Sequence, residues 1–253
     1  MLGRKKTLKI EFVSEMKGVA DAFPVLKASQ YKRKWVDRAM DDYKKSHKDN
    51  DRQSFFVRCT GAFALFRKGY ILTAWYDVSI ITKKGEEGFA WKLPIKGKLE
   101  DELGGKPIEA QPDSIAKWIP KRTGQISSLV KINSPLHVIA PKGVKLLFLP
   151  VPYPEQFDFE SSMGILDPAE STELNVQLHW YKEDGEVIIK AGTPLMYMLP
   201  LYDGAEDIEV NTRDANEKEL EFFKKVDYFH SFAFELYKYR NKIKKLYKEY
   251  FLD

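Results

Sequence analysis

The sequence contains a single cysteine, Cys59, among 253 residues. One cysteine excludes an intramolecular disulfide framework and any all-cysteine metal site, and it fits a reducing compartment. We expect Cys59 to be a small, buried apolar residue. The sequence also lacks a run of about 18 apolar residues, and no apolar stretch follows the charges at its start, which excludes an ordinary membrane-spanning helix and a signal peptide. We therefore expect a soluble, unexported protein without a membrane partner.

Metal-ligand and nucleophile motifs are also missing. The four histidines, His47, His137, His179 and His230, are far apart and form no His-x-His or His-x-Asp pair, so we predict no metal site. His179 is expected to be a strand histidine with satisfied hydrogen bonds. Neither a Gly-x-Ser-x-Gly motif nor a phosphate-binding loop occurs.

A large excess of one charge is absent as well. The chain has 41 Lys and Arg against 37 Asp and Glu, and a net charge of +4 is too small to indicate nucleic acid by itself. Two clusters, residues 27–48 and 238–248, nevertheless mix cations with aromatic residues, a composition found on weak nucleic-acid surfaces. The commoner explanation is a solvated helix face. If the second cluster binds nucleic acid, its candidate residues are Lys238, Arg240, Lys244 and Lys245.

Periodic patterns predict the elements of an α+β N-terminal region. Apolar and polar residues alternate from Thr7 to Val13, which predicts a half-buried strand. Residues 31–48 carry apolar side chains at helical spacing among many charges, which predicts an amphipathic surface helix. Residues 54–132 are rich in β-branched and aromatic residues and read as strands, with one short helix near Ala62 to Arg67. Three prolines within residues 150–154 exclude a central strand and predict a rigid edge or loop.

The C-terminal segment has a helical pattern. Residues 215–251 contain no Pro or Gly and repeat apolar residues in heptads, which predicts one long helix. Its aromatic stripe either packs on the chain's own β surface or meets a neighbouring subunit. Bulky rings at successive heptads argue against a tight two-stranded coil and favour a β surface. These patterns divide the chain into residues 1–52, 53–210 and 211–253.

The middle region resembles the trimeric dUTPase and dCTP deaminase superfamily. The resemblance lies in the order and spacing of turns: Pro141 to Gly143, Pro150, Gly164 to Asp167, and Gly192 to Leu195. It implies a mainly β fold with α additions, whose core is a dUTPase-like distorted β-barrel of the β-clip type. Barrels of this class commonly trimerise and form their sites between subunits, so the resemblance also implies a homo-oligomer.

The same resemblance implies candidate nucleotide-site residues. Asp167 falls on the family's general-base position and Glu173 on its supporting glutamate, while Tyr197, Gly164 and Gly192 would contact the nucleotide, with Mg as the cofactor. The chain departs from the family where Glu170 replaces the stacking tyrosine and residues 151–153 replace the phosphate-binding Arg-Ser-Gly. The family's glycine-rich C-terminal arm also has no counterpart.

A plainer interpretation of the same positions needs no nucleotide. Asp167 precedes Pro168 and starts a turn in which its carboxylate binds a backbone amide. Gly164 and Gly192 are turn residues with positive φ. Glu173 is then an exposed charge on a strand.

Along most of its length the chain is similar to a family of proteins encoded by tailed phages. The resemblance runs through Trp35, Cys59, Trp75, Gly164 to Asp167 and Gly192 to Leu195. It implies an infected bacterial cytoplasm or a virion as the setting, and other phage proteins as partners. We therefore expect a non-catalytic binding or assembly protein. The alternatives are a nucleotide pyrophosphatase or nucleotide-binding protein, and a nucleic-acid-binding accessory protein.

Overall fold

Alternating apolar residues near the start of the chain form strand β1 (Thr7–Ser14), in which Ile10 and Phe12 are fully buried. The protein is described from a computed structural model at residues 7–45, 56–93, 107–111, 118–204, 207–230 and 236–252. The predicted strand is confirmed. β1 lies in the centre of a three-stranded sheet, antiparallel to β8 (Leu136–Ile139) and parallel to β15 (Asp207–Asp214).

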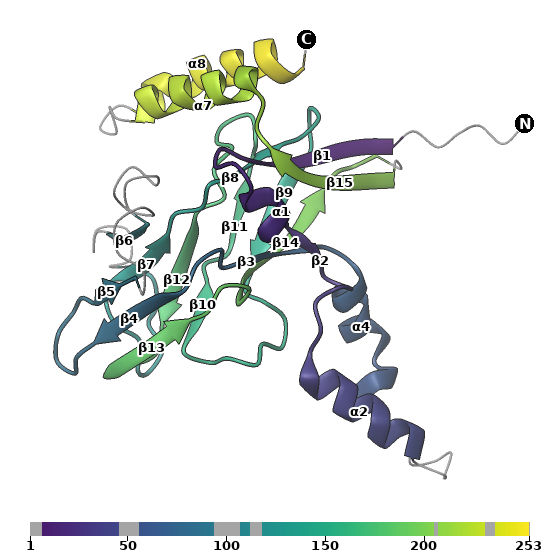
Figure 1. The fold of residues 1–253 in the computed structure, drawn as a ribbon, viewed down its shortest axis with the longest axis vertical. Helices are drawn as coiled ribbons and strands as arrows, with labels where there is room; N and C mark the ends of the chain where they lie inside the picture. Colours follow the sequence, from purple (N-terminus) through teal and green to yellow (C-terminus); the bar gives the residue numbers. More distant parts are fainter. Residues whose placement is uncertain are drawn as a thin grey trace, which may run out of the picture.

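A five-stranded sheet forms the middle of the molecule and has the order β11-β9-β14-β3-β2 (Figure 1). Its strands are β2 (Leu26–Lys27), β3 (Tyr70–Thr73), β9 (Lys145–Leu149), β11 (Gly164–Leu166) and β14 (Pro194–Leu201). β14 is central, and five consecutive residues, 194–198, are buried because the strand is covered on both faces.

Two further sheets complete the β region. One has the order β10-β12-β7-β6 and the other β13-β4-β5. Their strands are β4 (Val78–Thr82), β5 (Ala90–Lys92), β6 (Ile108–Gln111), β7 (Leu129–Ile132), β10 (Phe159–Ser161), β12 (Val176–Trp180) and β13 (Gly185–Ile189). Fully buried residues from several sheets, including Phe12, Ile80, Val130, Trp180 and Met198, share one hydrophobic core.

The four sheets are open, and no closed barrel forms among the described strands. The prediction of a strand-rich protein with C-terminal helices is confirmed, as a mixed α/β fold in which the sheets surround a common core. The expected barrel closure is not seen, because the hydrogen-bonded ladders stop at the sheet edges. Turn spacing in the sequence carries no information about whether an edge strand finds a further partner.

The C-terminal segment forms two helices instead of the single helix we predicted. Helices α7 (Glu217–His230) and α8 (Leu236–Phe251) pack antiparallel across one end of the molecule (Figure 1). The aromatic stripe explains the difference, because its rings pack between the two helices: Phe222 lies 4.8 Å from Phe251, and Phe229 lies 5.3 Å from Tyr239. A single straight helix would leave these rings in water.

The helix pair is seated on the sheet that contains β1. Val13 and Ile139 of that sheet form one buried cluster with Phe222 and Tyr247 of the helices. This confirms that the stripe docks on the chain's own β surface. Burying a side chain the size of Phe222 stabilises the fold by about 2–3 kcal/mol.

The remaining helices lie near the N-terminus. They are α1 (Val19–Ala22), α2 (Lys34–Lys45), the 3-10 helix η1 (Phe56–Arg58) and α4 (Thr60–Arg67). The predicted helices near residues 31–48 and 62–67 are confirmed as α2 and α4. Cys59 is exposed just before α4, so its predicted burial is wrong. No described helix is long and apolar enough to cross a membrane.

The described residues 27–45 and 56–68 form an extension that we call the basic arm. In Figure 1 α2 and α4 project from the sheets at the lower right. Helix α2 buries none of its residues. Gly69 joins the arm to β3, with φ of 77° and with the hydroxyl of Tyr197 packed against it.

Candidate functional site

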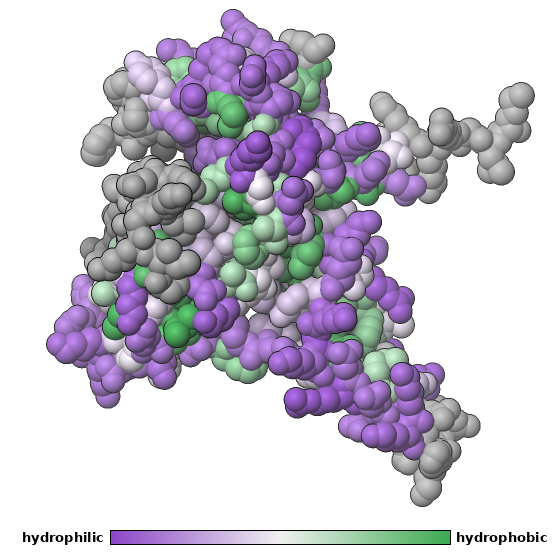
Figure 2. Space-filling view, in the orientation of Figure 1, coloured by the Kyte–Doolittle hydropathy of each residue, from purple (hydrophilic) through white to green (hydrophobic). Residues whose placement is uncertain are grey.

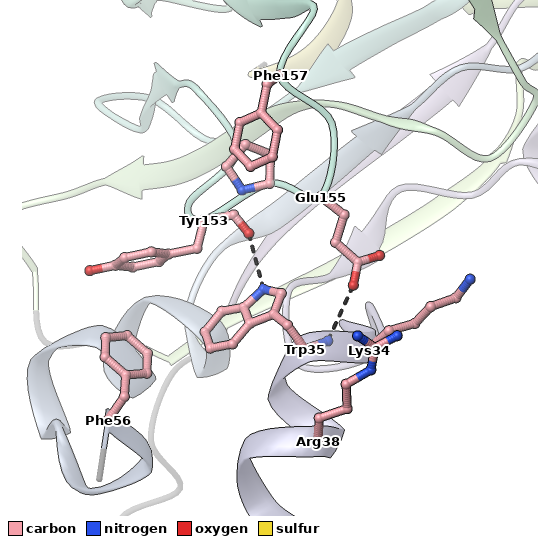
Figure 3. Close-up of a pocket in the computed structure, with 8 residues that line it drawn as sticks. Lys34, Trp35, Arg38, Phe56, Tyr153, Glu155 and Phe157 are labelled. Atoms are coloured by element: carbon pink, nitrogen blue, oxygen red, sulfur yellow. Dashed lines mark hydrogen bonds between the residues drawn. The ribbon is translucent and has the colours of Figure 1, made fainter. Parts of the chain in front are cut away.

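An open cleft of about 910 Å³ lies between α2, η1 and the loop that follows β9. We call it the aromatic cleft. Its lining residues are Lys34, Trp35, Arg38, Phe56, Tyr153, Pro154, Glu155 and Phe157 (Figure 3). Aromatic rings from three separate segments meet here, and two cations lie on α2 beside them.

Trp35 ties the arm to the loop after β9. Its indole Nε1 donates a hydrogen bond to the carbonyl oxygen of Tyr153 (3.3 Å), and its backbone N–H donates to Oε1 of Glu155 (3.3 Å). The first N–H groups of a helix have no partner within the helix, so the carboxylate of Glu155 also complements the start of α2. The Trp35 ring lies 5.4 Å from Phe56 and 6.1 Å from Tyr153.

Tyr153 has a strained backbone. Its φ of 51° makes it the one non-glycine residue with positive φ in the described part of the chain. A left-handed conformation costs a non-glycine residue about 1–2 kcal/mol. Such strain persists where the surroundings impose it, and it is concentrated at binding and active sites. The strained backbone presents a ring that is 49% exposed, close to Phe157, which is 77% exposed.

A buried cation lies beneath the rings. Arg33 is 4% exposed, and its guanidinium lies 4.3 Å from the centroid of Phe66, which in turn packs 5.8 Å from Trp35. Nη1 of Arg33 donates to the carbonyl oxygen of Tyr31 (3.3 Å), whereas Nε and Nη2 have no partner among the described residues. Burial lowers the pKa of Arg33, but an arginine remains charged. A positive charge is therefore buried behind the aromatic rings that pack against the cleft.

The basic arm concentrates the positive charge of the chain. Its described residues hold 10 of the 41 Lys and Arg residues but only 3 of the 37 acidic residues, so their net charge of +7 exceeds the +4 of the whole chain. Figure 2 shows hydrophilic side chains over most of the arm, with a few hydrophobic patches among them. Within the described residues, Lys34, Arg38 and Arg58 form no salt bridge.

A second cavity, of about 740 Å³, lies under α8, and we call it the lysine-lined cavity. Its cations are Lys9, Lys142, Lys244 and Lys248, and its acidic residues are Glu11 and Asp167. A hydrogen bond from Arg213 lowers the pKa of Glu11. Tyr247 forms part of the floor; burial raises its pKa to about 12, and its hydroxyl donates to the carbonyl oxygen of Ala140 (2.8 Å).

No family model, curated protein or solved structure matches the chain. The geometry of the two sites therefore carries the functional argument.

Asp167 lies in the lysine-lined cavity and starts a turn. Its Oδ1 accepts a hydrogen bond from the amide of Ala169 (3.1 Å), and its Oδ2 lies 3.6 Å from Nζ of Lys145. The turn interpretation is confirmed. Glu170, which replaces the family's tyrosine, binds Arg240 and Lys244 of α8 through its carboxylate, and the hydrogen bond from Lys244 is the largest cause of its lowered pKa.

The other predicted nucleotide-site residues lie elsewhere. Glu173 pairs with His137 in a β-bridge and accepts a hydrogen bond from Asn175. Tyr197 is fully buried, and its hydroxyl donates to the carbonyl oxygen of Lys68 (2.7 Å). The structure does not bring either residue to Asp167.

The two glycines of the predicted nucleotide site, Gly192 and Gly164, differ in backbone conformation. Gly192 has φ of 84° in the turn before β14, as predicted, and lines a small pocket beside Glu155. Gly164 begins β11 and is not among the residues with positive φ, so the turn prediction for it is wrong. Neither glycine lines the lysine-lined cavity.

The predicted nucleic-acid residues of α8 are largely paired with carboxylates. Arg240 and Lys244 bind Glu170, and Nζ of Lys245 lies 3.9 Å from Glu249. The side chain of Lys238 lies outside the described residues.

Both ring nitrogens of His179 form hydrogen bonds, as predicted, with the side chains of Gln125 and Ser162 at 3.1 Å each. The described residues contain no group of three His, Cys, Asp or Glu side chains that could hold a metal.

The aromatic cleft was missed in the sequence. The helical spacing of residues 31–48 places Trp35 on the apolar face of a helix, and the prolines of residues 150–154 predict only a rigid edge or loop. The available signal was Tyr153 between two prolines, because such a segment cannot bury its ring in a sheet. Its meeting with α2, more than 100 residues earlier in the chain, follows only from the fold.

Proposed function

We propose that this protein is a non-catalytic binding protein that engages a polyanionic partner through the aromatic cleft. The observation that carries the proposal is the convergence, at one opening on the basic arm, of exposed rings and of cations that form no salt bridge with the described residues. An aromatic face gains by leaving water, and an unpaired cation gains by meeting an anion. The cleft contains one carboxylate, Glu155, against the two cations Lys34 and Arg38, and its Oε1 accepts a hydrogen bond from the amide of Trp35.

Binding of a panel of polyanions tests this proposal. The panel contains a thymidine 20-mer, heparin and an acidic peptide that contains Trp, each titrated against wild type and Phe157→Ala. Phe157 is 77% exposed, so its truncation leaves the core unchanged. We expect at least one polyanion to bind wild type more tightly than the variant. A panel in which no member distinguishes the two proteins contradicts the proposal.

The architecture and setting belong to the same proposal. We infer a β-clip relationship for the open sheets around the common core, supported by the turn at Gly143, whose φ is 85°. We also propose a homo-oligomer or an assembly with other phage proteins, in an infected bacterial cytoplasm or a virion.

Edge strand β11 supports self-association, because Ile165 is 62% exposed on it and neighbouring Met163 is 74% exposed. Light scattering of wild type and Ile165→Glu tests this, with a smaller particle expected for the variant.

The lysine-lined cavity favours a second candidate function, nucleotide binding or pyrophosphate release. Asp167 lines a cavity that Lys142 and Lys244 also reach, which is a suitable setting for a triphosphate. The two carboxylates of the cavity are bound by Lys145 and Arg213, so Mg would arrive with the nucleotide. Pyrophosphate release from deoxynucleoside triphosphates, with Asp167→Asn as control, tests it. Turnover that the variant lacks would establish this candidate.

A further inference from the structure

The aromatic cleft offers two kinds of contact to one ligand. Tyr153 and Phe157 are exposed enough to receive a planar group, at 49% and 77%. Lys34 and Arg38 lie on α2 beside these rings, without a carboxylate partner among the described residues. Figure 3 shows the rings grouped on one side of Trp35 and the two cationic side chains on the other. A ligand that uses both kinds of contact therefore carries flat apolar groups and negative charges.

The positive charges of the basic arm around the cleft favour a long polyanion as the ligand. Arg33 lies beneath the rings, and Arg58, Arg67 and Lys68 are exposed on the same arm. A polymer with a charge at every repeat can contact several of the exposed cations at once, whereas a small anion contacts one or two.

We propose that the aromatic cleft binds single-stranded nucleic acid, with bases stacked on Tyr153 and Phe157 and phosphates at Lys34, Arg38 and Arg58. This inference rests on the proposed function and names its ligand. Each nucleotide supplies both an aromatic face and a phosphate, as the cleft requires. A duplex keeps its bases inside and leaves the rings uncovered, so single strands are favoured. An acidic peptide satisfies the cations, but most of its residues have no planar group for the rings.

Fluorescence anisotropy with a labelled thymidine 20-mer tests the ring contacts. Phe157→Ala should weaken binding by about 5- to 150-fold, the range that the loss of one stacked base gives. Tyr228→Ala is the matched control, because Tyr228 is an aromatic residue of α7 that is also largely exposed, at 64%, and lies outside the cleft. Its affinity should equal that of wild type. A 20-mer duplex should bind more weakly than the single strand.

Salt dependence tests the phosphate contacts. Each phosphate neutralised on a single strand contributes a slope of about −0.7 to the plot of log affinity against log salt concentration. The double variant Lys34→Gln with Arg38→Gln should therefore reduce the slope by about 1.4. The control Lys245→Gln, on α8, should leave it unchanged.

The outcomes separate this inference from the proposed function. Equal affinity of wild type and Phe157→Ala for the single strand overturns the inference, as does equal or tighter binding of the duplex. If the acidic peptide binds in a manner that Phe157→Ala weakens while the oligonucleotide does not bind, the inference fails and the proposed function stands. If no polyanion of the panel, heparin included, responds to the substitution, both the inference and the proposed function fail.

Discussion

The basic arm and helix α8 have similar compositions and different electrostatic surroundings. Both mix lysine and arginine with aromatic residues. On α8, Glu170 binds Arg240 and Lys244, and Glu249 lies close to Lys245. On the arm, Lys34 and Arg38 form no salt bridge within the described part of the chain. A cluster of cations in a sequence therefore becomes a binding surface or a structural contact according to the acidic residues that the fold places beside it.

The largest effect should follow from disturbing the junction between the arm and the sheets. In Gly69→Ala the new Cβ would lie 2.6 Å from the hydroxyl oxygen of Tyr197 and 2.7 Å from the carbonyl oxygen of Met198, at φ of 77°. We expect the free energy of unfolding in urea to fall by about 3 kcal/mol. Gly61→Ala, in α4 with open space around it, is the control and should be neutral or stabilising by up to about 1 kcal/mol. A tolerated Gly69→Ala would show that the arm is not held at this point.

Charge reversal compares the two cationic regions directly. Lys34→Glu combined with Arg38→Glu should lower affinity for the thymidine 20-mer by more than about tenfold in 100 mM salt. The same change at Lys224 and Lys245, on α7 and α8, should alter affinity by less than about threefold. Anisotropy titrations of the two double variants decide between the regions. A larger loss of affinity in the variant of Lys224 and Lys245 would place the binding surface on α7 and α8 instead of the arm.

Removing the negative charge of Glu170 should leave Arg240 and Lys244 of α8 without their salt bridges to this residue. Glu170→Gln releases Arg240 and Lys244, so we expect stronger oligonucleotide binding and a loss of about 1 kcal/mol in the free energy of unfolding. Hydrogen bonds from Lys244 and Arg240 lower the pKa of Glu170. The stabilisation is therefore complete above the pKa of an unfolded glutamate and is lost as the pH falls through the lower folded value. Urea titrations should show that the free energies of unfolding of wild type and Glu170→Gln become equal in acid. At neutral pH the control Glu249→Gln should have the same free energy of unfolding as wild type.

The smallest effect on stability should come from Tyr153→Asn. Asparagine tolerates the left-handed conformation better than tyrosine, so relief of strain should offset the lost ring contacts to within about 1 kcal/mol. Oligonucleotide affinity should nevertheless fall, because the exposed ring is gone. Thermal unfolding and anisotropy on one preparation separate the two quantities. A variant that binds as well as wild type would remove Tyr153 from the proposed site.

Local patterns predicted local structure well. The alternation at residues 7–13, the helical spacing in α2 and the turn at Asp167 each depend on neighbours in the sequence, and each is confirmed. The helix pair α7 and α8 could not be predicted, since a heptad stripe has the same pattern whether it faces another helix or its own sheet. The predicted division near residue 210 stays a prediction; β15, which pairs with β1, runs across that position.

The candidate site was the least predictable part. Trp35 and Tyr153 are 118 positions apart, and their hydrogen bond depends on the packing of the whole chain. The family resemblance implies a site made of Asp167, Glu173 and Tyr197, but of these only Asp167 lines the lysine-lined cavity. Exposure of an aromatic ring, the property that defines the aromatic cleft, is decided by tertiary packing and not by residue type.

The pairing of β1 has a consequence for synthesis of the chain. Thr7 pairs with Asp207 and Ser14 with Asp214, whereas the antiparallel neighbour β8 supplies residues 136–139. During translation at about 5–20 residues per second, β1 waits roughly 10–40 s for its second neighbour after it leaves the ribosome. Until then one edge of β1 is unpaired, and Ile10 and Phe12 lack their final covering. Aggregation of nascent chains should therefore increase under conditions that slow the synthesis of the residues between β1 and β15.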